Sequence, residues 1–406
     1  MISPDDQGEP LGGHLRMASG TPSGDRFNVA RRHRVSNPRR SGVAQVPKRV
    51  INREKRRLFA AAACGLGVVG ALIIAELALR VHVAWRGWTP NCYVTGLAFF
   101  VPDAEAGYTL RPGLRIRSTT YDISVNSLGL RGPEIRVAKA PGRVRIAVLG
   151  GSAVFGYLVA DAEDPCRILE RELQGRGWQV EVINAGVPGY NLTQCRARYE
   201  SVVAPLQPDI VLIYAGWNDI PTLIASDPAA VERTAGAPPL WQRCLSHSVL
   251  YGFLRYRLFP PPAPRFAPPP SAGTTVSDAG AALVEQEYRR LIEAVERSGA
   301  RLVLSTQLHA GCENCSGVTQ YLGDSPAQVE TNQQIARWLD ACVRRLAHEG
   351  DLPLVEICGT VPCNQRTLGD AIHPTAEGYR QIVARWVATL ERLLSETSES
   401  SQEDGA

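Results

Sequence analysis

A serine on a glycine-rich turn is the first candidate for chemistry. Ser152 lies in LGGSAVFG, residues 149–156, directly after an apolar run. A serine between a strand and a helix exposes its hydroxyl for nucleophilic attack, and its N–H at the helix N-terminus suits an oxyanion. A phosphate-binding loop has similar glycines, but the GxxxxGK[ST] pattern does not occur in this segment. The turn therefore favours Ser152 as a nucleophile.

A histidine that could act as a base lies near the end of the chain. The sequence DAIHP, residues 370–374, places Asp370 three residues before His373. This separation lets both side chains turn towards one pocket, where the carboxylate would orient the imidazole. By itself, each residue also has a structural interpretation, as a turn cap for Asp370 and a hydrogen-bonded loop histidine for His373.

Two further segments offer hydrogen-bond donors. Gly186 lies in NAGVPGYN, residues 184–191, and Asn218 lies in GWND, residues 216–219. A glycine N–H and an asparagine amide, together with the N–H of Ser152, would hold the oxyanion of a tetrahedral intermediate. Gly186 could also serve only in a turn, and Asn218 could cap a helix. As a set with an acid–base pair, the segments predict acyl transfer through a covalent intermediate.

The elements that must position these residues alternate between strands and helices. Apolar runs predict strands at 144–149, 180–183, 210–214, 301–304 and 353–357, and helical apolar spacing fills the intervals between most of them. This rhythm predicts a five-stranded parallel sheet in a three-layer α/β/α sandwich of flavodoxin-like type. The Ser152, Gly186 and Asn218 segments each follow a strand, and open sheets of this kind bind ligands at the carboxyl ends of their strands.

In these segments the chain resembles the SGNH/GDSL hydrolases. LGGSAVFG, NAGVPGYN, GWND and DAIHP are similar to blocks I, II, III and V of that family, and the resemblance covers residues 143–395. It implies a nucleophile at Ser152, oxyanion donors at Ser152, Gly186 and Asn218, and a triad completed by Asp370 and His373. One departure is Gly151, where many members have aspartate. NSLGLRG, residues 126–132, resembles the segment before the domain in membrane-anchored or exported members.

The region before the predicted hydrolase domain indicates a membrane anchor. Residues 58–79 form an apolar segment whose only charge is Glu76, and about 1.5 Å per residue lets them cross a 30 Å hydrocarbon core. Twelve Lys or Arg residues and one acid lie from Arg26 to Arg57. The positive-inside rule then predicts a cytoplasmic N-terminus and an extracytoplasmic (periplasmic or cell-surface) domain. A cleaved signal peptide is the alternative.

The chain of 406 residues is thus divided into five regions. We expect a disordered basic tail at 1–57, a transmembrane helix at 58–79, a lead-in at 83–142, the hydrolase domain at 143–395 and a disordered acidic tail at 396–406. A Pro-rich insertion at about 221–280 is expected to be a long loop inside the domain. The basic residues concentrate in the tail, which argues against a nucleic-acid-binding body.

The ten cysteines bear on compartment and on metal binding. Outside the cytoplasm some should form disulfides, and the pairing we favour is Cys358 with Cys363. Cys312 and Cys315 form a CxxC, compatible with a redox pair, half a zinc site or a local disulfide. All four together could also bind zinc.

The sequence therefore predicts a membrane-anchored serine esterase that needs no cofactor and no metal. The partners expected are an ester substrate, with a cell-envelope glycan or a lipid as candidates, and the membrane through the 58–79 helix. An O-acyltransferase or deacetylase acting on an envelope glycan would use the same residues with a different acceptor. A non-catalytic binding protein on the same fold is the alternative from another class. The sequence does not predict the oligomeric state.

Overall fold

The computed structural model describes residues 53–86, 99–117, 122–157, 159–225, 245, 248–258 and 275–403. The chain divides into two compact units, residues 1–61 and residues 62–406. Of the first unit, only the start of helix α1 (Arg53–Arg86) lies within the described residues. Most of the predicted basic tail and of the Pro-rich insertion lies outside them.

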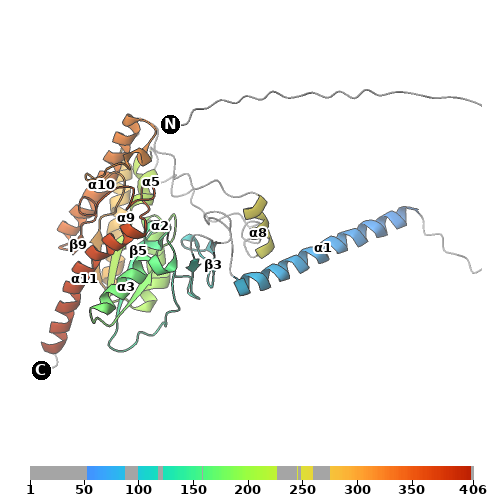
Figure 1. Cartoon of the computed structure of the whole chain (residues 1–406), viewed down its shortest axis with the longest axis horizontal. Coiled ribbons are helices and arrows are strands. Elements are labelled where there is room, and N and C mark those ends of the chain that lie inside the picture. The colour runs from blue at the N-terminus through green and yellow to red at the C-terminus, as the bar shows by residue number, and fades with distance from the viewer. Residues whose placement is uncertain are drawn as a thin grey trace, which may run out of the picture. The chain divides into compact units, whose positions relative to one another are not determined.

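A five-stranded parallel sheet forms the centre of the second unit (Figure 1). Its order is β6-β5-β7-β8-β9, which is the 2-1-3-4-5 order of flavodoxin-like folds. The strands are β5 (Val144–Gly150), β6 (Val180–Asn184), β7 (Ile210–Tyr214), β8 (Arg301–Ser305) and β9 (Leu354–Val355). The predicted sheet is confirmed, and the last strand is shorter than expected.

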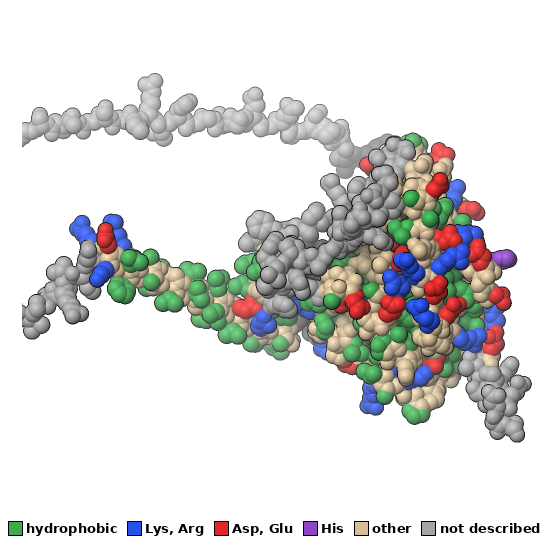
Figure 2. All heavy atoms as spheres, turned by 180° about the vertical axis from the view of Figure 1, so that it is seen from behind, with side chains coloured by type: hydrophobic (Ala, Val, Ile, Leu, Met, Phe, Trp, Pro, Cys, Tyr) green, Lys and Arg blue, Asp and Glu red, His purple; other side chains and the backbone are tan. Residues whose placement is uncertain are grey.

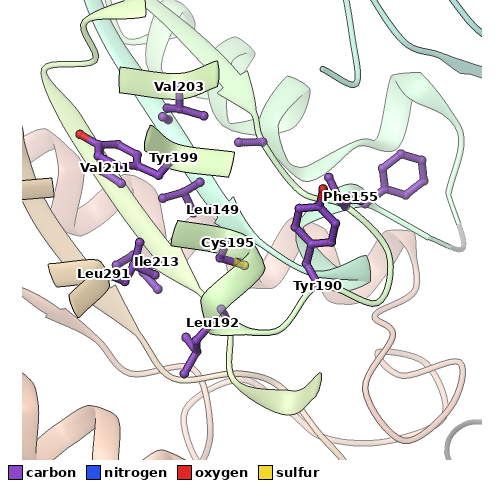
Figure 3. Close-up of a cluster of buried hydrophobic side chains, with 14 of the residues drawn as sticks. Leu149, Phe155, Tyr190, Leu192, Cys195, Tyr199, Val203, Val211, Ile213 and Leu291 are labelled. Atoms are coloured by element: carbon purple, nitrogen blue, oxygen red, sulfur yellow. The ribbon is translucent and has the colours of Figure 1, made fainter. Parts of the chain in front are cut away.

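Successive side chains of the strands point to opposite faces and bury two separate apolar layers. On one face, alternate residues of β5 and β7 pack against α4 (Leu192–Arg198), α9 (Asp278–Arg297) and α10 (Pro326–Glu349). The other residues of the same strands pack against α3 (Pro165–Gly175) and α11 (Ala376–Glu403). Figure 3 shows the first layer, in which Leu149, Val211 and Ile213 meet Cys195 and Leu291. The three-layer sandwich follows from this period-two burial.

Local signals account for the helix boundaries. The side chain of Asp164 accepts hydrogen bonds from the N–H groups of Cys166 and Arg167, and Pro165 begins α3. Ser277 and Ser325 cap α9 and α10 in the same way. The short helix α2 (Ser152–Phe155) follows β5 directly, and α5 (Ile220–Ile224) follows β7 after a helical turn at Trp217–Asp219. Helix α11 continues to Glu403, so the residues expected to begin a disordered tail at 396 are helical.

The lead-in contributes two antiparallel strand pairs that pack into the first apolar layer. Strand β1 (Phe100–Asp103) pairs with β2 (Gly107–Leu110), and β3 (Arg115–Arg117) pairs with β4 (Asp122–Ser124). The side chains that it buries there include Leu110, Leu114, Ile116, Ile123 and Leu130. The lead-in therefore shares its core with the sheet.

Helix α1 is long and apolar enough to cross a membrane, and none of its most apolar stretch is buried. Figure 2 shows hydrophobic side chains along it between charged ones near its two ends. The carboxylate of Glu76 accepts hydrogen bonds from the N–H groups of Val249 and Leu250, at 3.0 and 2.7 Å. These residues begin α8 (Val249–Leu258), a helix inside the segment that we expected to be a long loop.

Two disulfides join the loop after β8 to the loop after β9. Cys312 pairs with Cys358 and Cys315 with Cys363, with Cα–Cα distances of 5.3 and 4.3 Å. The favoured Cys358–Cys363 pair was therefore wrong, because each of these cysteines faces a residue of the CxxC across the two loops. The bridges close loops of 46 and 48 residues instead of a local one.

A buried ion pair holds the elements around β5 together. The guanidinium of Arg131, from the lead-in, lies 3.4 Å from the carboxylate of Asp164, and both side chains are fully buried. Arg131 also donates to the carbonyl oxygens of Phe155, Gly156 and Val159, at 2.5, 2.6 and 2.8 Å. The three carbonyls follow α2 or end it, so Arg131 fixes the turn that follows Ser152.

Asp164, the acidic partner of this ion pair, is also held by several hydrogen bonds. Asp164 accepts from the N–H of Cys166 at 2.7 Å and from the amide of Asn184, at the end of β6, at 3.0 and 3.1 Å. Burial raises the pKa of the Asp164 carboxyl, and Arg131 opposes that effect. Without the guanidinium, the charged form of Asp164 would lie in the core without its cation.

We predict that Arg131→Met lowers the free energy of unfolding by about 3–5 kcal/mol at pH 7.5, because an unpaired buried charge remains. The folded-state pKa of Asp164 would lie still further above its unfolded value, so the variant's stability falls as pH rises and recovers towards pH 5. Urea unfolding at both pH values measures this. Arg176→Met, at a half-exposed arginine on the surface, should change stability by about 0.5 kcal/mol or less. A loss of stability equal to that of Arg176→Met would contradict the prediction.

Candidate active site

Ser152 follows the carboxyl end of β5 and is the first residue of α2. The strand ends at Gly150, Gly151 precedes the short helix, and Gly156 follows it in the left-handed conformation (φ 80°). The side chain of Ser152 is partly exposed, while the rest of α2 is buried. The serine hydroxyl is thus presented at the sheet edge by rigid neighbours, as the sequence predicts.

His373 and Asp370 come to the same place from a loop more than two hundred residues away. The Nε2 atom of His373 lies 2.6 Å from the Oγ of Ser152, and its Nδ1 lies 2.9 and 3.0 Å from the carboxylate oxygens of Asp370. The carboxylate also accepts from the N–H groups of Ile372 and His373, which fixes its orientation. Because a carboxylate only accepts, Nδ1 carries the proton and Nε2 is left to accept from Ser152.

The segment after β7 brings an amide to the same edge. Asn218 lies in the helical turn Trp217–Asp219, and its Nδ2 donates to the carbonyl oxygen of Tyr190 at 2.9 Å. The carboxylate of Asp219, which is 3% exposed, accepts from the N–H of Leu192. The loops after β6 and β7 are therefore joined by two hydrogen bonds, and Asn218 lies beside Ser152 in one small pocket.

Gly186 does not join the other predicted residues. Its N–H donates to the side-chain oxygen of Asn184 at 2.9 Å, and it does not line the pocket that contains Ser152 and Asn218. A Cβ at this position would lie 2.8–2.9 Å from backbone atoms of Val154 and Phe155. The glycine is thus needed for the close approach of this loop to α2, and the prediction of a donor at Gly186 has no support in the structure.

Most of the residues that line the pocket were not among the predicted site residues, and three of them have large side chains that matter for its shape. Trp217 and Ile372 line the pocket from segments whose other residues were predicted, and Gln307 enters it from the loop after β8. The side-chain oxygen of Gln307 accepts from the N–H of Trp217 at 3.1 Å. The position of Gln307 just after a predicted strand was the only signal in the sequence, since no motif marks it.

The absence of a side chain at Gly151 has a steric cause. A Cβ there would lie 2.6 Å from Nδ2 of Asn218 and 3.3 Å from the carbonyl oxygen of Tyr190. These two atoms form the hydrogen bond that orients the Asn218 amide. The departure from the Gly-Asp-Ser pattern therefore leaves room for Asn218 next to the serine.

The four cysteines considered as a zinc site are paired in disulfides, so they offer no thiolates in this structure. His309 and Asp340 lie close to the Cys312–Cys358 bridge, and all four side chains place a donor atom within 4.8 Å of the others. The Nε2 of His309 is hydrogen-bonded to Asp340 at 2.9 Å, and its Nδ1 accepts from the N–H of Gly311. The donor atoms of this cluster are thus already engaged with one another.

The fold and the site define a hydrolase of the α/β/α sandwich type with a serine at the end of its first central strand. The model of the GDSL-like lipase/acylhydrolase family matches residues 148–381, more than half of the chain. The chain belongs to this family and is an ester-bond hydrolase. The expected resemblance is confirmed.

Solved structures with a similar fold include several hydrolases of low sequence identity. A GDSL-like lipase from Bacteroides thetaiotaomicron is 16% identical, with 62% of this chain and 88% of that one covered and a TM-score of 0.35. A lipase/acylhydrolase from Enterococcus faecalis is 17% identical, with 60% and 94% covered and a TM-score of 0.39. A catalytic mutant of an acetylxylan esterase from Geobacillus stearothermophilus is 14% identical, with 61% and 93% covered and a TM-score of 0.37. No curated protein matches the chain.

We predict that Gly151→Ala lowers kcat for p-nitrophenyl acetate by about 10²-fold, because the new Cβ displaces the Asn218 amide from the pocket. Gly175→Ala, where a Cβ meets nothing within 4 Å, is the matched control and should leave the rate unchanged. Steady-state kinetics of both variants measure the effect, with thermal unfolding to show that each is folded. A Gly151→Ala variant with the wild-type rate would contradict the steric argument.

Proposed function

We propose that this hydrolase is a serine esterase in which Ser152 is the nucleophile, His373 the general base and Asp370 the group that orients it. The observation that carries the proposal is the continuous hydrogen-bonded chain from Oγ of Ser152 through the imidazole to the Asp370 carboxylate. The distance of 2.6 Å from Oγ to Nε2 lets His373 take the hydroxyl proton, and the 2.9 Å contact with Asp370 holds the imidazole in place.

In the first half-reaction, Oγ of Ser152 attacks the ester carbonyl carbon while Nε2 of His373 takes the hydroxyl proton. The carbonyl oxygen becomes an oxyanion. As the tetrahedral intermediate collapses, the bond to the leaving alcohol breaks and His373 returns the proton to that alcohol. Water then attacks the acyl-enzyme with His373 again as base, which releases the carboxylic acid and restores the Ser152 hydroxyl.

The N–H of Ser152 and the amide of Asn218 are the proposed oxyanion donors. Asn218 uses one amide hydrogen for the carbonyl of Tyr190, so its second hydrogen is available to the substrate. A third oxyanion donor must be a group other than Gly186, because the N–H of Gly186 donates to the side chain of Asn184. Gly189 fits best, since it immediately precedes Tyr190 in the pocket wall and its N–H makes no hydrogen bond within the described part of the chain.

We predict that a fluorophosphonate probe labels the wild-type protein and does not label Ser152→Ala, because the probe reacts with an activated serine. The same change should lower kcat for p-nitrophenyl acetate by about 10⁴-fold or more. Ser201→Ala, at an exposed serine on the helical segment that follows α4, is the control and should label normally. Labelling of folded Ser152→Ala at the wild-type level would exclude Ser152 as the nucleophile.

We also propose that α1 anchors this domain on the extracytoplasmic side of a membrane. The basic residues that precede α1 and its unburied apolar surface support a helix with its N-terminus in the cytoplasm. The two disulfides support the same side for the domain, since such bonds persist in oxidising compartments. An envelope glycan or a lipid ester is then within reach of the site.

The orientation is tested by mapping free and paired cysteines in protein purified from the membrane fraction. The protein is unfolded in denaturant that contains iodoacetamide, which alkylates the free thiols. We predict disulfide-linked peptides for Cys312–Cys358 and Cys315–Cys363. Cys166, which is buried and unpaired, should be alkylated and serves as the internal control. Peptides from residues 26–57 should also be present, because an anchor is not removed. Alkylation of all four paired cysteines would contradict the orientation, and loss of the N-terminal peptides would indicate a signal peptide.

A further inference from the structure

The pocket in front of Ser152 has a floor made of main chain. Ala215 and Gly216 form it at the end of β7, and Gly216 has a positive φ of 119°. The hydroxyl of Tyr288, from α9, donates to the carbonyl oxygen of Ala215 at 2.7 Å, and any Cβ on Gly216 would meet that hydroxyl. This floor cannot recede without displacing a buried helix from the sheet.

One wall of the pocket is an indole held in place by a buried dyad. The ring of Trp217 lies 5.5 Å from the ring of His309, centroid to centroid. His309 is 2% exposed and accepts from the N–H of Gly311, so its other nitrogen donates to Asp340. The backbone of Trp217 is held in turn by Gln307. The indole therefore has fixed contacts on the side away from the pocket.

A second wall residue is Ile372, which is 3% exposed and belongs to the Asp370–His373 loop. Its N–H donates to the Asp370 carboxylate at 3.0 Å, and the neighbouring Ala371 accepts at its carbonyl from the N–H of Ala310 at 2.8 Å. Any outward movement of Ile372 would disturb the hydrogen bonds that orient His373. Both walls are thus coupled to groups that cannot move freely.

The space left between floor and walls is small. The pocket has room for about one water molecule, which is close to the size of a methyl group. We infer that the site takes esters of short acyl groups, acetyl above all, and that Trp217 and Ile372 set this limit. The inference rests on the proposed function, because it places the acyl group of the Ser152 ester in this pocket and the alcohol on its open side.

The test is the acyl-length profile of the full-length chain in detergent, measured as kcat/KM for p-nitrophenyl acetate, butyrate and hexanoate. Wild type should lose about tenfold or more between acetate and butyrate, since added methylenes collide with rigid walls. Trp217→Ala and Ile372→Ala should each raise the butyrate-to-acetate ratio by about tenfold. Trp217→Phe keeps an aromatic ring beside His309 and should give a smaller rise, which covers the case in which the alanine variant does not fold.

Trp178→Ala is the matched control, because that indole packs against the same apolar layer as Trp217 but does not line the pocket. Its acyl-length profile should equal that of wild type. A wild type that hydrolyses hexanoate as well as acetate would overturn the inference, as would unchanged ratios in the folded Trp217 and Ile372 variants. Fluorophosphonate labelling of the same samples separates the two proposals. A labelled enzyme with a long-chain preference refutes the short acyl pocket alone, whereas an unlabelled and inactive protein refutes the serine mechanism as well.

Discussion

The ion pair between Arg131 and Asp164 is the constraint on which the rest of the site depends. Both groups are fully removed from water, where each charge would cost several kcal/mol without its partner and its hydrogen bonds. Arg131 donates hydrogen bonds to carbonyl oxygens of the turn after Ser152. Asp164 accepts hydrogen bonds from the start of α3 and from the end of β6. A network of this kind is stable only when all its members are in place, so it ties the lead-in, the serine turn and two elements of the sandwich into one geometry.

The remaining parts of the site are supplied by strand ends, which the parallel sheet gathers at one edge. Ser152, the proposed nucleophile, follows β5, the amide of Asn218 follows β7, and Gln307 follows β8. His373 arrives from a loop that is joined to the loop after β8 through Ala310 and Ala371, and the two disulfides hold the loops after β8 and β9 together. The proposed oxyanion donors and the proposed base are therefore oriented before a substrate binds, which is the condition for electrostatic stabilisation of an oxyanion.

The contribution of the lead-in changes the picture of the domain. The segment 83–142 was expected to be a lead-in separate from the hydrolase domain, yet its strands bury apolar side chains in the same layer as β5 and β7. Tyr108 of β2 donates to the carbonyl of Pro188 at 3.0 Å, two residues before the pocket residue Tyr190. The strand pair that follows the proposed membrane anchor in the sequence is therefore hydrogen-bonded to the segment that leads into the pocket wall.

The sequence by itself determined the strands, the polar segments that follow them, and the three hydrogen-bonded residues Ser152, His373 and Asp370. It could do so because apolar periodicity and the residue types after strand ends are local properties of a sequence. It did not determine which cysteine faces which, where the N–H of Gly186 points or which residues enclose the pocket. Those depend on contacts between segments far apart in sequence, such as the loop of Cys312 and Cys315 against that of Cys358 and Cys363. Only tertiary packing decided them, since each is a choice among several locally acceptable partners.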